Sequence, residues 1–144
     1  MNAKNFLAGL GGAIALNLLH ESLKNTKADT PRIDLVGEEA LQKALGFFGG
    51  RIESQQVLYN ATLAGDVISN ATYYSMIGND QSNIWKKAVS LGLVAGIGAV
   101  ALPSKMGLDD RPVAKNTQVK VLTVGYYVAG ALVTAGILKL LRKE

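Results

Sequence analysis

Hydrophobic residues are concentrated in four blocks of the chain, which are separated by polar segments. A helix needs about 20 mostly apolar residues to cross the ~30 Å hydrocarbon core of a bilayer. The first block has 15 uncharged residues in a row, and the last has 18, followed by three basic residues. We therefore predict an all-α integral membrane bundle of four transmembrane helices. The expected spans are about residues 5–23, 57–77, 85–102 and 119–141.

A fifth helix is predicted between the first two spans, over about residues 31–48. A Thr-Pro pair at 30–31 is a typical helix start, and the Gly-Gly pair at 49–50 ends it. Its apolar residues fall on one helical face and its charged residues on the other. Two basic and three acidic residues make it slightly acidic, which argues against a polybasic lipid anchor. We expect an amphipathic helix docked on the protein; one lying on the membrane fits the same pattern.

The polar connector between the third and fourth blocks covers residues 103–118. Pro103 is expected to end the third span, and Asn116 or Thr117 is expected to cap the fourth helix. A loop of this length is either a solvated surface segment or a functional one.

Small residues recur at four-residue spacing within the blocks. The chain has 16 glycines, and each would cost ~1 kcal/mol in the interior of a water-soluble helix. Membrane helices instead use small residues for close backbone contact. This pattern fits packing within one bundle and assembly of a homo-oligomer equally well. The positions predicted to lie at helix contacts are Gly65, Ser69, Gly92 and Gly96.

Composition narrows the classes of function. The absence of Cys excludes disulfides, thiolate metal sites and thiol nucleophiles. The net charge of +4 comes from basic residues that flank the apolar blocks, which suits membrane-interface anchors rather than nucleic-acid binding. The length predicts a single domain, residues 1–144. The first block loosely resembles a signal peptide, but its apolar core is short and broken by Gly, so we expect an uncleaved span.

Asp66 is the only charged residue in the second block, residues 57–77. An ionisable group near the bilayer centre costs at least ~2.5 kcal/mol unless it is paired, hydrated or neutral. Such a residue is a candidate functional site. The alternative is a protonated or hydrogen-bonded side chain that only fixes helix packing.

Other polar residues are placed to face Asp66. In the second block they lie one or two helical turns away from it, and in the first block three of them share a helix face. Antiparallel neighbours would bring the end of the first span to the start of the second. We therefore predict one intramembrane polar track, made of Asp66, Asn70, Tyr59, Asn60, Asn17, His20 and Glu21.

Three chemistries could use such a track, and the favoured one is passage of protons or small ions. A metal site formed by His20, Glu21 and Asp66 is weaker, because the chain has one His, no Cys and no spaced ligand motif. Catalysis with His20 as general base lacks a nucleophile motif. We therefore expect no catalytic residues, no metal and no cofactor.

The leading hypothesis is a small channel- or transporter-like membrane protein, a homo-oligomer, with Asp66 at its centre. The alternative is a non-catalytic structural or accessory subunit of a membrane complex, and a lipid-directed enzyme comes third. The expected partners are the lipid bilayer and other membrane subunits, and nucleic acid is not expected. The expected location is a plasma or inner membrane. The positive-inside rule slightly favours the two long connectors in the cytoplasm.

Overall fold

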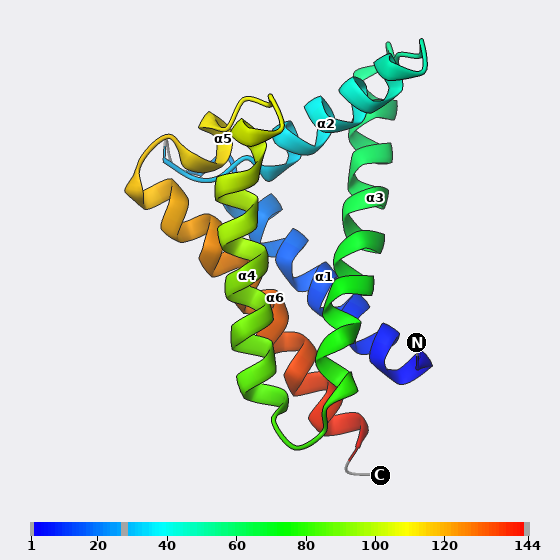
Figure 1. Cartoon of the computed structure of the whole chain (residues 1–144), viewed down its shortest axis with the longest axis vertical. Helices are drawn as coiled ribbons and strands as arrows, with labels where there is room; N and C mark the ends of the chain where they lie inside the picture. Colours follow the sequence, from blue (N-terminus) through cyan, green and yellow to red (C-terminus); the bar gives the residue numbers. More distant parts are fainter. Residues whose placement is uncertain (1, 27–28, 143–144) are drawn as a thin grey trace.

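The computed structural model describes residues 2–26 and 29–142, and every regular element in these ranges is helical. This confirms the all-α class. Four long helices lie along one another, and α2 lies across one end of them (Figure 1). The elements are α1 (Ala3–Leu23), α2 (Ile33–Phe47), α3 (Gln55–Ser75), η1 (Met76–Asn79), α4 (Ile84–Lys105), α5 (Arg111–Ala114) and α6 (Thr117–Leu141).

The chain passes along the bundle four times (Figure 1). α1 runs towards the end covered by α2, which we call the α2 end, and α3 returns to the opposite, η1 end. α4 then runs back to the α2 end, and α6 returns. α1 packs on α3 and α6, and α4 packs on α6. α3 and α4 share a turn at the η1 end and diverge towards α2 (Figure 1).

The helix predicted over residues 31–48 forms as α2, with bounds shifted by one or two residues. It ends because Gly49 adopts a left-handed conformation with φ of 80°, which favours glycine. The Gly50 N–H then donates to the carbonyl of Leu45 at 2.8 Å. α2 contacts α3 and α5, so it is docked on protein in this structure.

The prediction that the third span ends at Pro103 is wrong by two residues, since α4 continues to Lys105. Pro103 lies in the last turn of α4, where its missing N–H removes one hydrogen bond, and its own carbonyl accepts from the Leu108 N–H at 2.8 Å. Gly107, with φ of 75°, closes the helix. The connector that follows is also not all loop, because it holds α5.

The N-terminus of α6 is capped as predicted. The Asn116 side chain accepts from the Val119 N–H at 2.9 Å. This satisfies one of the backbone donors that a helix start leaves unpaired.

Glycines set the separation between α4 and α6. A Cβ added at Gly92 would lie 2.8 Å from Val128 Cα, and one added at Gly96 would lie 2.6 Å from Val124 Cα. Gly65 differs, because no atom lies within 4 Å of its Cβ position. Gly65 and Ser69 are both exposed. The small residues of α4 therefore serve packing within the chain, and those of α3 do not.

The predicted count of four spans requires a correction. Among the described residues, three helices are long and apolar enough to cross a membrane, namely α1, α4 and α6. α3 is as long as α1, with 21 residues. It falls short in composition, because Asp66 and several Asn, Tyr and Thr side chains lower its hydropathy.

Candidate functional site: a cavity with a buried acidic wall

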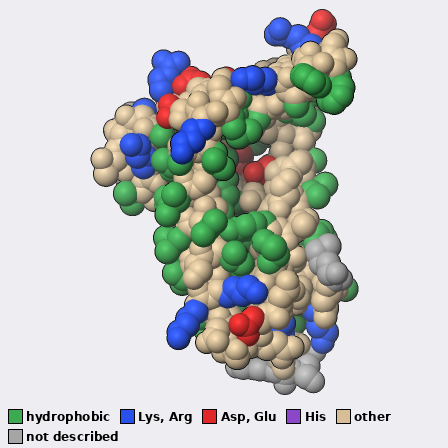
Figure 2. All heavy atoms as spheres, viewed as in Figure 1, with side chains coloured by type: hydrophobic (Ala, Val, Ile, Leu, Met, Phe, Trp, Pro, Cys, Tyr) green, Lys and Arg blue, Asp and Glu red, His purple; other side chains and the backbone are tan. Residues whose placement is uncertain are grey.

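A cavity of about 780 Å³ lies between α1, α2, α3 and α4, in the half of the bundle next to α2. It exists because α3 and α4 diverge while α2 bridges their ends. Figure 2 shows the corresponding hollow, with acidic side chains inside it. α4 and α2 contribute mostly apolar residues to its wall, and α1 and α3 contribute the polar ones.

Asp66 stands on the α3 wall of this cavity. Each of its carboxylate oxygens accepts one amide hydrogen bond at 3.0 Å, Oδ2 from Asn17 and Oδ1 from Asn70. Asn17 also donates to the Ala13 carbonyl at 2.9 Å, which fixes the direction of its amide. Within the described part of the chain, no Lys, Arg or His lies within ion-pair distance of Asp66. The carboxylate is thus hydrogen-bonded but not neutralised.

His20 lies on the α1 side of the cavity, near the α2 end, and is 4% exposed. Its Nε2 lies 3.1 Å from the Ile33 N–H nitrogen and 3.2 Å from Asp34 Oδ1. A neutral Nε2 accepts from Ile33, whereas a protonated Nε2 donates to Asp34. Nδ1 lies 3.6 Å from Glu21 Oε1. His20 therefore joins the end of α1 to the start of α2.

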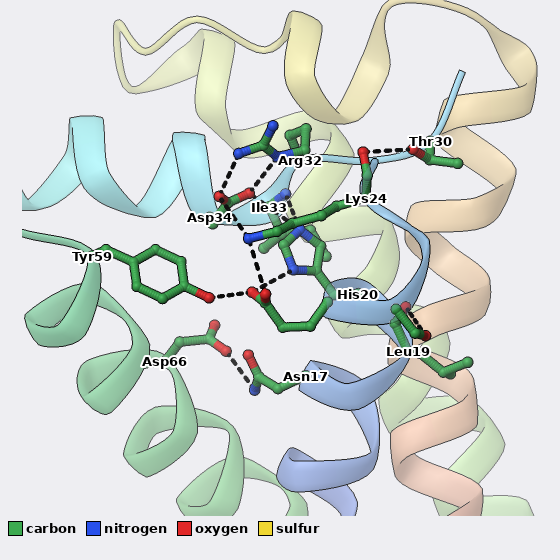
Figure 3. A network of polar contacts seen from close by, with 12 residues as sticks. Asn17, Leu19, His20, Lys24, Thr30, Arg32, Ile33, Asp34, Tyr59 and Asp66 are labelled. Carbon is green, nitrogen blue, oxygen red and sulfur yellow. Dashed lines mark hydrogen bonds and ion pairs between the residues drawn. The ribbon is translucent and has the colours of Figure 1, made fainter. Parts of the chain in front are cut away.

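Two ion pairs surround His20 (Figure 3). Arg32 holds Asp34 in a bidentate pair, with distances of 3.0 and 2.8 Å. Burial alone would raise the pKa of Asp34, but hydrogen bonds from His20 and Arg32 outweigh it and hold that pKa well below its ordinary value. The bond to Asp34 also raises the pKa of Arg32. These groups neutralise one another.

Glu21 is satisfied in the same way. Lys24 Nζ lies 2.9 Å from Glu21 Oε2, and the Tyr59 hydroxyl donates to Oε1. Lys24 also lies 4.9 Å from the centre of the Tyr59 ring, a cation–π distance. Figure 3 shows this cluster, with Asp66 and Asn17 beside it and separate from its ion pairs.

The structure brings most of the predicted track residues together but not all of them. Asn60 is exposed and accepts from Gln56 at 3.0 Å, away from the cavity. Towards the η1 end, the Tyr73 hydroxyl donates to the Leu91 carbonyl and the Tyr74 hydroxyl to the Tyr127 carbonyl, each at 2.7 Å. The Tyr73 hydroxyl thus connects α3 to α4, and the Tyr74 hydroxyl connects α3 to α6.

The polar track stops at mid-bundle. Beyond Tyr73 and Tyr74 the bundle is closed by a fully packed apolar core. Its members come from all four long helices and η1, and they are Ala8, Tyr74, Ile77, Ile84, Ala88, Ala131, Ala135 and Leu138. Among residues 2–26 and 29–142, this core separates the cavity at the α2 end from the η1 end.

Sequence reasoning missed Lys24, Arg32 and Asp34. Charged residues are common in polar connectors, so the sequence does not mark these three as part of a site. Their contacts arise only when the chain folds back from α1 to α2.

The structure does not bring together the ligands of the alternative metal site. Among residues 2–26 and 29–142, no three His, Asp or Glu side chains are grouped to hold a metal ion.

Comparison with known proteins gives no family for this chain: no protein-family model, curated protein or solved structure matches it significantly. The case for a function therefore rests on the cavity itself.

Proposed function

We propose that this is an integral membrane protein, with α1, α4 and α6 crossing the bilayer. The surface of these helices supports a position inside the bilayer. Large apolar side chains are exposed along these helices, and Lys and Arg gather at the two ends (Figure 2). Val94 on α4 is 63% exposed and Val121 on α6 is also 63% exposed. In water such surfaces would be costly, at ~25 cal/mol per Å² of apolar area.

We further propose that α3 crosses the membrane with them. Its composition alone does not suffice, but the chain path requires a return. α1 ends at the α2 end and α4 starts at the η1 end, so the segment between them must traverse the same thickness. Polar residues of α3 such as Asp66 face the cavity, while Val57 and Ile68 are exposed on its outer side. A helix whose polar side faces the interior of a bundle or a cavity is tolerated in a membrane.

The function that the geometry supports best is transport, with the cavity as the substrate site. The observation that carries this proposal is Asp66: a carboxylate in the wall of a cavity, held by two amides and left without a cation. Burying a charge in this way is costly unless a proton or ligand compensates it. The closed η1 half favours a transporter, which opens its two ends in turn, over an open channel.

Proton and potassium flux into reconstituted liposomes tests this proposal. We expect Asp66→Asn to reduce the flux by about tenfold or more, because a neutral amide cannot compensate the transported charge. Glu53→Gln is the matched control, since it removes an exposed carboxylate near the start of α3. Size-exclusion chromatography in the same detergent checks that assembly is unchanged. Equal flux through wild type and Asp66→Asn would overturn the role of Asp66.

A second candidate, an accessory subunit of a membrane complex or homo-oligomer, is favoured by the small residues of α3. Ala61, Gly65 and Ser69 are exposed in the wall of the cavity, and the Cβ position of Gly65 has open space around it, so a helix of another subunit could pack closely there. This role predicts that Asp66→Asn is tolerated and that Gly65→Leu disrupts assembly. Gly136→Leu is the control, because Gly136 also has open space around its Cβ position.

A further inference from the structure

The cavity has a chemical character that narrows its ligand. We infer that it binds an amphiphilic organic cation, in which a positively charged nitrogen or phosphorus centre is attached to an apolar body. This rests on the proposed function only in using the same cavity.

The charge of the site selects a cation. Lys24 is paired with Glu21, and Arg32 is paired with Asp34. Neither of these two basic side chains is therefore free to attract an anion. Asp66 has only amide donors, and its remaining lone pairs are available. An anionic headgroup in this cavity would meet an uncompensated carboxylate, whereas a cation would neutralise it.

Two further features of the wall suit a cationic head. Thr62 lies one helical turn before Asp66, lines the cavity, and has a buried hydroxyl oxygen with no hydrogen-bond partner. It can accept a hydrogen bond from a bound ammonium group. Tyr73 and Tyr127 also line the cavity, and an aromatic ring can bind a cation over its face.

The size and the opposite wall of the cavity require an apolar body. A volume of about 780 Å³ lies within the ~300–1,000 Å³ of typical small-molecule pockets. Val94, Ala95, Ala99 and Leu102 on α4, together with Val36 and Leu41 on α2, form the apolar part of the lining. A bare metal ion would leave this space unfilled, and one carboxylate with two amides offers too few oxygens for it.

The entrance fits a molecule that partitions into lipid. The hollow opens at the surface between α3 and α4 (Figure 2), and Val94 at this level is 63% exposed. With α4 in the bilayer, a ligand would reach Asp66 from the membrane. Lipophilic cations concentrate there, and Asp66 selects the charge.

Binding to the purified 144-residue protein in detergent tests the inference, with tetraphenylphosphonium as the probe. Tetraphenylborate is the matched control, because it has nearly the same shape and the opposite charge. We expect saturable binding of the cation, at least about tenfold weaker binding of the anion, and a similar loss in Asp66→Asn. Glu53→Gln should bind as wild type does.

Val94→Trp keeps the test valid if Asp66→Asn fails to fold. It narrows the cavity from the opposite wall without touching the carboxylate, and it should also weaken binding of the cation. Equal binding of both ions, or unchanged affinity in a folded Asp66→Asn protein, would overturn the inference.

The two proposals fail separately. Binding of tetraphenylphosphonium that depends on Asp66, without flux of any ion, supports the inference and overturns transport. Proton flux that depends on Asp66, without binding of tetraphenylphosphonium, supports transport and overturns the inference.

Discussion

At the scale of single residues, the molecule treats its buried carboxylates in two ways. Asp34 is neutralised by Arg32 and faces His20, while Asp66 receives only the amides of Asn17 and Asn70. The first arrangement is typical of a structural anchor, because it closes α2 onto α1. The second leaves charge facing an open volume, which is the pattern of a binding residue.

Asp34→Asn should destabilise the protein by about 1–3 kcal/mol at neutral pH, because Arg32 and His20 lose the carboxylate charge and one of its two acceptor oxygens becomes a donor. The low pKa of Asp34 in the folded state means that its contribution is fully present above the unfolded pKa of ~3.9. It is lost progressively as the pH falls below that value towards the folded pKa. Thermal unfolding in detergent from neutral to acidic pH measures the difference. A constant gap between wild type and variant across this range would contradict the assignment.

The sequence alone exposes only some of these residues. Asp66, Asn17 and Asn70 stand out because they interrupt apolar blocks, and helical spacing aligns two of them. Arg32 and Asp34 do not stand out, because charge is ordinary in a connector. Their importance arises from a tertiary contact, in which the N–H of Ile33 reaches His20.

At the scale of elements, small residues act differently on two helices that look alike in sequence. Gly92 and Gly96 of α4 lie against the backbone of α6, whereas the small residues of α3 are exposed in the wall of the cavity. Small residues at four-residue spacing indicate a helix face that allows close packing, but they do not indicate which element packs on that face. The positions of the five predicted helices were correct to within three residues, whereas α5 in the connector was not predicted.

Gly96→Ala should separate α4 from α6 and lower stability by about 1–3 kcal/mol, because the new Cβ would lie 2.6 Å from a backbone carbon that cannot move alone. Gly136→Ala is the control, as its Cβ would meet no atom within 4 Å. Thermal unfolding of both variants in one detergent checks this. Equal stability of the two would contradict the close contact between α4 and α6.

α3 was predicted to be a membrane span from the pattern of its residues, but its mean hydropathy is too low for one. The polar residues that remove it from the set of apolar helices are partly the ones that line the cavity. A count of apolar residues treats the two sides of a helix alike, whereas a membrane senses only the exposed side. The location of α3 therefore depends on its neighbours.

At the scale of the whole molecule, the site is a consequence of topology. α3 and α4 meet at one end and separate at the other, and α2 covers the separation (Figure 1). No local sequence pattern encodes this divergence, because it results from both helices packing on the α1–α6 pair rather than on each other. The closed core lies at the η1 end, where α3 and α4 meet, and the cavity lies at the α2 end, where they diverge.

Transport across such a molecule requires the closed half to open. The bonds of Tyr73 and Tyr74 to the backbones of α4 and α6 are the contacts that must break for α3 to move. Tyr73 lies about two helical turns from Asp66 towards the η1 end and lines the same cavity, so a charge bound at Asp66 would lie on the cavity side of these contacts.

The most direct test of this account is the flux of protons, potassium and tetraphenylphosphonium into liposomes containing wild type, Asp66→Glu or Asp66→Asn at matched density and oligomer size. The account predicts flux of at least one of these ions through wild type. It also predicts partial flux of that ion in Asp66→Glu, which keeps the charge, and a rate close to that of empty liposomes in Asp66→Asn. Unchanged flux in Asp66→Asn, or no flux of any of these ions through wild type, would contradict it.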